Sequence, residues 1–242
     1  MSMTVLKIAK DVGNKLGVTP SATLYGSVDA FAIRMIALLE DECRFLRNQR
    51  IFPQQKKLHS FTVTSARVKY PLPSDFYAAV PGTTYDSQLD RRMVGPISDP
   101  AFNERLYGQG SNSHTAWRIY GPDANPASSG GQFYINPAPS NSTDVYTFDY
   151  ITKNLFYNST YATGSETIAA DTDVPLFDDD IVLKGVEWRY RESKGQSFDT
   201  QKAEHAVLLN AAVARWAPTF RGKFSRMVDG PRYSILDGGW SL

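Results

Sequence analysis

The spacing of apolar residues predicts two helices in the N-terminal part of the chain. Apolar residues recur at helical spacing from Thr4 to Leu16, and Gly17 is a typical stop. A second helix, capped by Ser27, is expected to run to about Asn48 and is apolar over more than half of its circumference. A helix of this kind is buried on two sides, and in a chain this small the second side can belong to a neighbouring subunit.

From Leu58 to Tyr161 the pattern changes to short runs of Val, Tyr, Phe and Thr between clusters of Gly, Pro, Asn and Ser. This alternation is typical of strands and turns. A short helix is expected at Pro96–Tyr107, and loops at Gly108–Ser113 and Gly121–Gly131. The predicted strands lie near His59–Val63, Val68–Leu72, Ala116–Ile119, Gln132–Ile135 and Asp144–Ile151.

Helical signals return after the strands. Asp178 is a suitable N-cap for a helix that runs to Lys194, and Gly195 is its expected stop. An alanine-rich helix should follow from Ser197 to Trp216. We therefore expect one helix pair at each end of a β-rich segment.

The last segment, Thr219–Leu242, has neither a helical nor a strand period. It is too apolar for a free disordered end and too small to fold alone. Aromatic and arginine side chains commonly anchor protein interfaces, so this tail is expected to lie along another chain. The candidate partner-binding residues are Arg221, Lys223, Phe224, Arg226, Arg232, Tyr233 and Trp240.

These elements predict an α+β protein. Its N- and C-terminal helices form a helical bundle, with an inserted β-rich domain and an extended C-terminal tail. The expected divisions are residues 1–54 for the N-terminal helices, 55–172 for the β-rich domain, 173–218 for the C-terminal helices and 219–242 for the tail.

Composition narrows the class of protein. Hydrophobic residues make up 42% and charged residues 21%, as in an ordinary globular protein. The net charge of +1 shows no basic excess of the kind typical of a DNA-binding protein, although DNA could still slide past such a surface. No apolar run approaches the ~20 residues of a membrane span, and the N-terminus has no signal-peptide core, so no membrane contact is expected.

The sequence offers no positive case for catalysis. His59, His114 and His205 form no ligand motif with one another, and the single cysteine, Cys43, is expected to be buried. No phosphate-binding glycine loop or nucleophile elbow is present. We therefore predict no catalytic residue, no metal, no cofactor and no enzymatic activity.

Three arginines follow one another near the end of the second helix. Arg47 and Arg50 share a helix face, and Arg44 lies one turn earlier. They could contact passing DNA phosphates or carboxylates of a neighbouring subunit. The alternative is a solvated helix end whose cations complement the helix dipole.

Several segments resemble those of one protein family. The matching segments are Val5–Gly17, Tyr70–Phe76 (YPLPSDF), Arg92–Ser98 (RMVGPIS), Tyr134–Pro139 with Phe148–Ile151, and Asp171–Gly195. In this order, over residues 4 to about 215, they resemble the head-to-tail adaptor (connector) proteins of short-tailed, podovirus-type bacteriophages. Physically they are turn, cap and packing motifs.

The resemblance implies a structural virion protein at the head-tail junction, made in the host cytoplasm. It implies a homo-oligomeric ring of twelve subunits below the portal protein, with the helical bundle around the DNA channel and the β domain outside. A downstream tail or nozzle protein would dock below, and packaged DNA would pass without sequence-specific binding. The tail after Trp216 is longer than in shorter family members, so its docking onto the portal or onto a neighbouring subunit is a hypothesis.

Two other functions stay open. A carbohydrate- or receptor-binding tail protein would agree with the tyrosine-rich β segment and the loops at 108–115 and 121–131. A tail-associated hydrolase is the third possibility.

Overall fold

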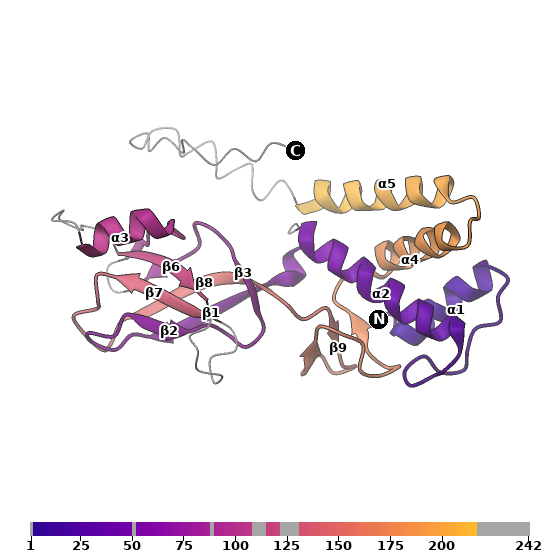
Figure 1. Cartoon of the computed structure of the whole chain (residues 1–242), viewed down its shortest axis with the longest axis horizontal. Coiled ribbons are helices and arrows are strands. Elements are labelled where there is room, and N and C mark those ends of the chain that lie inside the picture. Colours follow the sequence, from indigo (N-terminus) through magenta and orange to yellow (C-terminus); the bar gives the residue numbers. More distant parts are fainter. Residues whose placement is uncertain (1, 50–51, 88–89, 108–114, 122–130, 217–242) are drawn as a thin grey trace.

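The structure is a computed structural model that describes residues 2–49, 52–87, 90–107, 115–121 and 131–216 of the chain. Within these ranges the protein is a mixed α+β fold with helices and antiparallel sheets, which confirms the predicted class. The molecule is elongated: most strands gather at one end and four of the helices at the other (Figure 1).

The helices begin and end close to their sequence signals. Thr4 caps the first helix by accepting a hydrogen bond from the Lys7 backbone N–H at 3.3 Å, and Asp178 caps the fourth by accepting from Asp180 N–H at 3.4 Å. The second helix begins at Ala30, slightly after the predicted cap Ser27. The helices are α1 (Val5–Lys15), α2 (Ala30–Gln49), α3 (Asp99–Tyr107), α4 (Asp179–Ser193) and α5 (Asp199–Trp216).

Helix α4 contacts α1, α2 and α5 and is therefore central to the helical part (Figure 1). Its residues Ile181, Val182 and Val186 are buried in one hydrophobic cluster with Met35 and Leu39 of α2. Cys43 belongs to the same cluster and is fully buried, as predicted. Burial of this apolar surface is the main source of stability in the helical part.

The β-rich part is built from two antiparallel sheets. In the larger, β1 (Lys56–Thr62), β3 (Phe76–Ala79) and β4 (Tyr85–Asp86) each pair with β8 (Val145–Thr152), and β5 (Arg91–Arg92) pairs with β4. In the second sheet, β7 (Gln132–Asn136) lies between β2 (Lys69–Pro71) and β6 (Ala116–Tyr120). A second hydrophobic cluster, rich in aromatic rings, joins the two sheets.

A third small sheet lies beside the helices, as Figure 1 shows. It consists of β9 (Phe156–Tyr157) between β10 (Gly164–Ser165) and β11 (Val174–Pro175). Leu155, Phe156 and Ile168 are buried in the helical cluster, although the sequence patterns place them in the β-rich segment. The predicted end of the β-rich domain at residue 172 stays a prediction.

All five predicted strands occur near their expected positions, and the helix predicted at Pro96–Tyr107 begins at Asp99. The strands without a sequence prediction are short: β4, β5, β9, β10 and β11 have two residues each, and β3 has four. Two residues cannot display an alternating period, so these pairings depend on tertiary contacts.

Asp75 is a polar anchor between the turn after β2 and the strands of the larger sheet. Its carboxylate accepts hydrogen bonds from Lys57 Nζ at 2.7 Å, Tyr150 Oη at 2.8 Å and Thr152 Oγ1 at 2.9 Å. Its backbone carbonyl accepts from Lys153 N–H at 2.7 Å. Burial raises the pKa of Asp75, but the three side-chain donors outweigh this and hold the pKa below its ordinary value.

These contacts predict a pH-dependent loss of stability. Because the pKa of Asp75 is lower in the folded chain, its contribution is present above the unfolded-state pKa of about 4 and disappears as pH falls through the folded value. We expect Asp75→Asn to cost about 1.5 kcal/mol at pH 7, and less below about pH 4. Urea unfolding at pH 7 and pH 3 measures this, with Asp149→Asn on β8 as a control for charge removal. An equal cost at both pH values would contradict the prediction.

Candidate interaction surfaces

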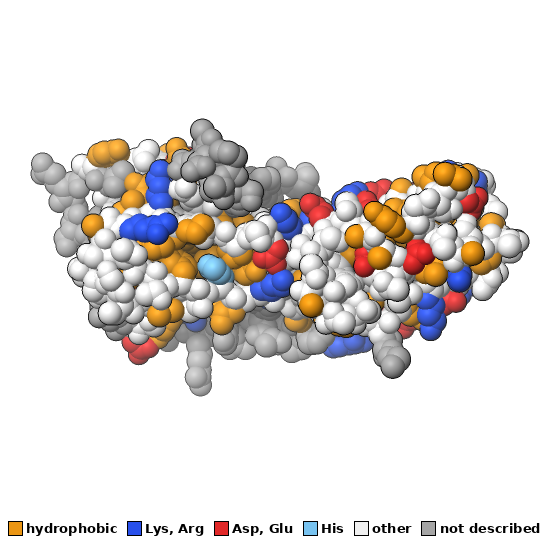
Figure 2. Space-filling model, turned by 90° about the horizontal axis from the view of Figure 1, so that it is seen from below, with side chains coloured by type: hydrophobic (Ala, Val, Ile, Leu, Met, Phe, Trp, Pro, Cys, Tyr) orange, Lys and Arg blue, Asp and Glu red, His pale blue; other side chains and the backbone are white. Residues whose placement is uncertain are grey.

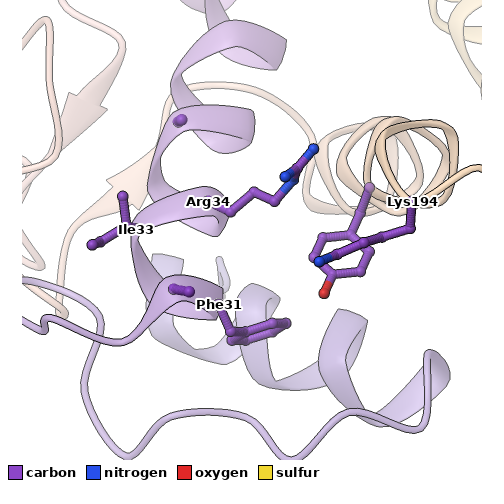
Figure 3. A pocket seen from close by; sticks show the side chains of 7 residues that line it. Phe31, Ile33, Arg34 and Lys194 are labelled. Atoms are coloured by element: carbon purple, nitrogen blue, oxygen red, sulfur yellow. The ribbon is translucent and has the colours of Figure 1, made fainter.

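A pocket of about 450 Å³ lies between the start of α2 and the end of α4 (Figure 3). Phe31 and Tyr190 are buried in its wall, whereas Ile33 is 56% exposed. The volume is within the range of sites that bind ligands or side chains of other chains. The lining residues are Ala30, Phe31, Ile33, Arg34, Ala37, Tyr190 and Lys194.

The pocket is positively charged at its rim. Arg34 donates from Nε to Ser193 Oγ at 3.0 Å and from Nη2 to the Ser193 carbonyl at 3.3 Å, which fixes the guanidinium across the end of α4. Lys194 Nζ lies 5.7 Å from the centre of the Tyr190 ring. The lining residues include these two cations and no acid. The pocket is thus suited to an apolar segment that carries a negative charge.

Apolar side chains are also exposed outside the pocket. Val28, just before α2, is 94% exposed, and Val207 on α5 is 67% exposed. Helix α5 buries His205 and Ala212 against the remaining helices, while Ala203, Ala206 and Val207 face away from them. The helical part thus exposes apolar positions at two separate places.

A buried ion network joins α2, α4 and α5. Glu42 is fully buried; its Oε2 accepts from Arg189 Nε at 2.7 Å, and its Oε1 lies 2.9 Å from His205 Nε2. Gly185 on α4 provides the space for this carboxyl group, because a Cβ at Gly185 would lie 2.2 Å from Glu42 Cδ. The network fixes the position of α5, which directly precedes the tail.

The three arginines of α2 have different environments. Arg44 is paired with Glu40 at 2.9 Å and with Asp41 at 3.1 Å, and its side chain is 40% exposed. Arg47 is buried: it donates to Glu166 Oε1 at 2.9 Å and lies 4.1 Å above the Tyr77 ring. Arg50 lies outside the described residues. The guanidinium of Arg47 is thus engaged inside the chain. Contact of Arg44, Arg47 and Arg50 with DNA or a neighbouring subunit stays a proposal.

The two histidines that the structure describes, His59 and His205, lie in different environments. His59 on β1 lies among aromatic rings, 5.4 Å from Phe148 and 5.8 Å from Phe61, and burial lowers its pKa. His205 belongs to the network with Glu42. His114 and the candidate tail residues Arg221, Lys223, Phe224, Arg226, Arg232, Tyr233 and Trp240 lie outside the described residues.

Figure 2 shows hydrophobic side chains grouped over the β-rich part, while acidic and basic side chains are interspersed over the helical part. Among the described residues, no group of three metal-ligating side chains comes together. None of the described helices combines the length and hydrophobicity that crossing a membrane requires.

Sequence reasoning did not identify the pocket or the ion network. One signal for the network was present: Glu42 is three residues after Leu39 and four before Leu46, so a carboxylate occupies the apolar stripe of α2. A charged residue there requires a buried partner. The pocket has no such signal, because its walls come from two helices distant in the sequence.

The family model described as SU10 adaptor protein matches residues 3–238, nearly the whole chain. The chain therefore belongs to the SU10 adaptor protein family and is a structural adaptor of bacteriophage particles. Among curated proteins, none matches the chain.

Proposed function

We propose that the protein is the head-to-tail adaptor of a short-tailed phage. In this role it forms a ring below the portal, extends the DNA channel and provides the platform for the next tail protein. The observation that carries the proposal is the adaptor-family match over residues 3–238. The motif segments that resemble podovirus-type adaptors support the head-tail position.

The exposed apolar positions of α2 and α5 support ring formation. A ring of identical subunits needs two different surfaces on each subunit, one that contacts the preceding copy and one that contacts the following copy. Two separate exposed apolar surfaces are candidates for these contacts: Val28 with Ile33 at the start of α2, and Val207 with its alanine neighbours on α5. The number of twelve subunits comes from the family resemblance.

The near-neutral charge supports a channel through which DNA moves without being held. Strong phosphate binding requires a surplus of cations, and each neutralised phosphate adds to the affinity. The chain has 26 basic and 25 acidic residues. Several described cations of the helical part are paired with acids, as Arg44 is with Glu40 and Lys184 is with Glu204.

In the assembled particle, the tail residues Arg221, Lys223, Phe224, Arg226, Arg232, Tyr233 and Trp240 are proposed to contact the portal or a neighbouring subunit. Their residue types are those that contribute most at interfaces. A variant that ends at Pro218 should then lose affinity for the portal. Full retention of affinity by that variant would remove the tail from the docking role and leave the helical surfaces.

A carbohydrate- or receptor-binding tail protein is the second candidate. Tyr107 is 82% exposed and Tyr120 is 43% exposed, at the end of the molecule where α3 packs against β6. Exposed tyrosine rings can provide a flat apolar face with a polar hydroxyl for a sugar. Binding on a glycan array that Tyr107→Ala and Tyr120→Ala abolish would favour this function.

Mixing the full-length protein with its cognate portal ring tests the primary proposal. Light scattering should show a defined complex that gains about twelve subunits, and imaging should show new density that continues the portal channel. Val28→Glu with Ile33→Glu is the surface variant that should reduce the number of bound subunits, and Leu58→Glu on β1, where Leu58 is 70% exposed, is the matched control. No association at micromolar concentrations with a competent portal would contradict the proposal.

A further inference from the structure

The α2–α4 pocket exposes both apolar surface and positive charge. Ile33 and Ala37 leave apolar surface exposed in it, and Arg34 and Lys194 place two cations at the rim. Exposed apolar surface is stabilised when it is covered, and unneutralised cations beside it favour an anion. An occupant that matches the site combines aliphatic side chains with an adjacent carboxylate.

The chain contains two such sequences after Trp216, namely Met227-Val228-Asp229 and Ile235-Leu236-Asp237. Asp229 lies three residues from Arg226 and three from Arg232, whose charges would be repelled by the cations of the pocket. Asp237 is five residues from its nearest basic neighbour, Arg232. Two glycines follow Asp237 and allow the chain to turn away from a concave site. The second sequence is therefore the better match.

The length of the tail permits this contact. The pocket lies at the C-terminal end of α4, which is where α5 begins, so the tail starts at the opposite end of α5. An 18-residue helix is about 27 Å long. Ile235 is 19 residues beyond Trp216, and 19 extended residues span about 60 Å. The tail therefore reaches the pocket with about twice the length required.

We propose that Ile235-Leu236-Asp237 docks into the α2–α4 pocket of its own chain before assembly. The aliphatic side chains cover Ile33 and Ala37, and the Asp237 carboxylate lies between Arg34 and Lys194. The same chain is favoured over a second copy because a tethered segment has an effective concentration in the millimolar range. Docking covers apolar side chains of the tail until a partner competes for them.

A cysteine cross-link in the isolated full-length protein tests this, so its outcome does not depend on portal binding. The pocket pair is Ala37→Cys with Leu236→Cys, and the only native cysteine, Cys43, is fully buried. The matched control is Val207→Cys with Leu236→Cys, because Val207 is exposed and lies on α5, closer along the chain to the tail. Under mild oxidation with diamide, the pocket pair should form an intramolecular disulfide about tenfold faster than the control pair.

A charge exchange provides the second measurement. Asp237→Lys and Arg34→Glu should each slow the cross-link of the pocket pair several-fold, and the two together should restore part of the rate. Circular dichroism confirms that each variant is folded; if the Ala37→Cys variant is not, Ile33→Cys replaces it. Equal rates for the pocket and control pairs would overturn the proposal. Disulfide-linked dimers in place of the intramolecular product would also overturn it and would identify a second copy as the occupant.

Discussion

Gly185→Ala is expected to lower the free energy of unfolding by about 3 kcal/mol, although alanine is the better helix former. The reason is the fully buried Glu42, whose Cδ would lie 2.2 Å from the new methyl group. A glutamate side chain usually moves aside at little cost. Here it cannot do so without breaking its contacts to Arg189 and His205.

The cost of moving Glu42 follows from its surroundings. One partner of the carboxylate, His205, is 5% exposed, and the side chain of the other, Arg189, is 22% exposed. The Arg189 guanidinium that loses its counter-charge recovers only part of its hydration at this partly buried position, and breaking a buried ion pair typically costs about 3–5 kcal/mol. Arg189 is partly exposed and recovers some hydration, so we expect Glu42→Ala to cost about 3 kcal/mol.

A double-mutant cycle separates the clash from the loss of the ion network. In a Glu42→Ala background the added methyl group meets no carboxyl group, so Gly185→Ala should then cost less than about 1 kcal/mol. Gly13→Ala in α1 is the matched control, because its nearest neighbours are 3.1–3.3 Å from the added Cβ. Urea unfolding followed by circular dichroism measures all four variants. Additive costs for Gly185→Ala and Glu42→Ala would show that Glu42 does not fill the space above Gly185.

The sequence signals located the helices because they are local, although the predicted cap Ser27 lies three residues before the start of α2. Thr4 and Asp178 act as caps through their own side chains, and the positive φ of Gly195 ends α4 as a glycine stop does. The longer strands were predictable for the same reason, since alternation along β8 places Tyr146, Phe148 and Tyr150 on one face.

Features that depend on distant residues were not predictable. The burial of Arg47 depends on Glu166 and Tyr77, which approach it only in the fold. Leu155 and Phe156 continue the aromatic pattern of the β-rich segment, yet they pack with the helices. Periodicity shows that a residue is buried but not which of two hydrophobic clusters it joins.

Phe148→Ala is expected to destabilise the β-rich part by about 3–5 kcal/mol. Phe148 is 1% exposed, and its ring lies 5.1 Å from Phe133 at an angle of 11° and 6.4 Å from Trp117. Removal of the ring leaves a cavity between rigid aromatic neighbours that cannot readily move into it. Leu39→Ala, at a fully buried position in the helical cluster, is the matched variant and should cost about 2–5 kcal/mol there.

Hydrogen exchange measured by mass spectrometry shows which part of the molecule each substitution destabilises. Phe148 and Leu39 belong to different hydrophobic clusters, so each variant should speed exchange mainly in its own part of the molecule. Peptides that contain β9 show which part of the molecule this strand belongs to. Their exchange should become faster in Leu39→Ala and stay unchanged in Phe148→Ala, because Phe156 packs with the helices. If they follow Phe148→Ala instead, the β-rich domain extends to residue 172 as the sequence patterns predict. If both variants speed exchange everywhere equally, the two clusters unfold as one cooperative unit, and the chain has a single domain.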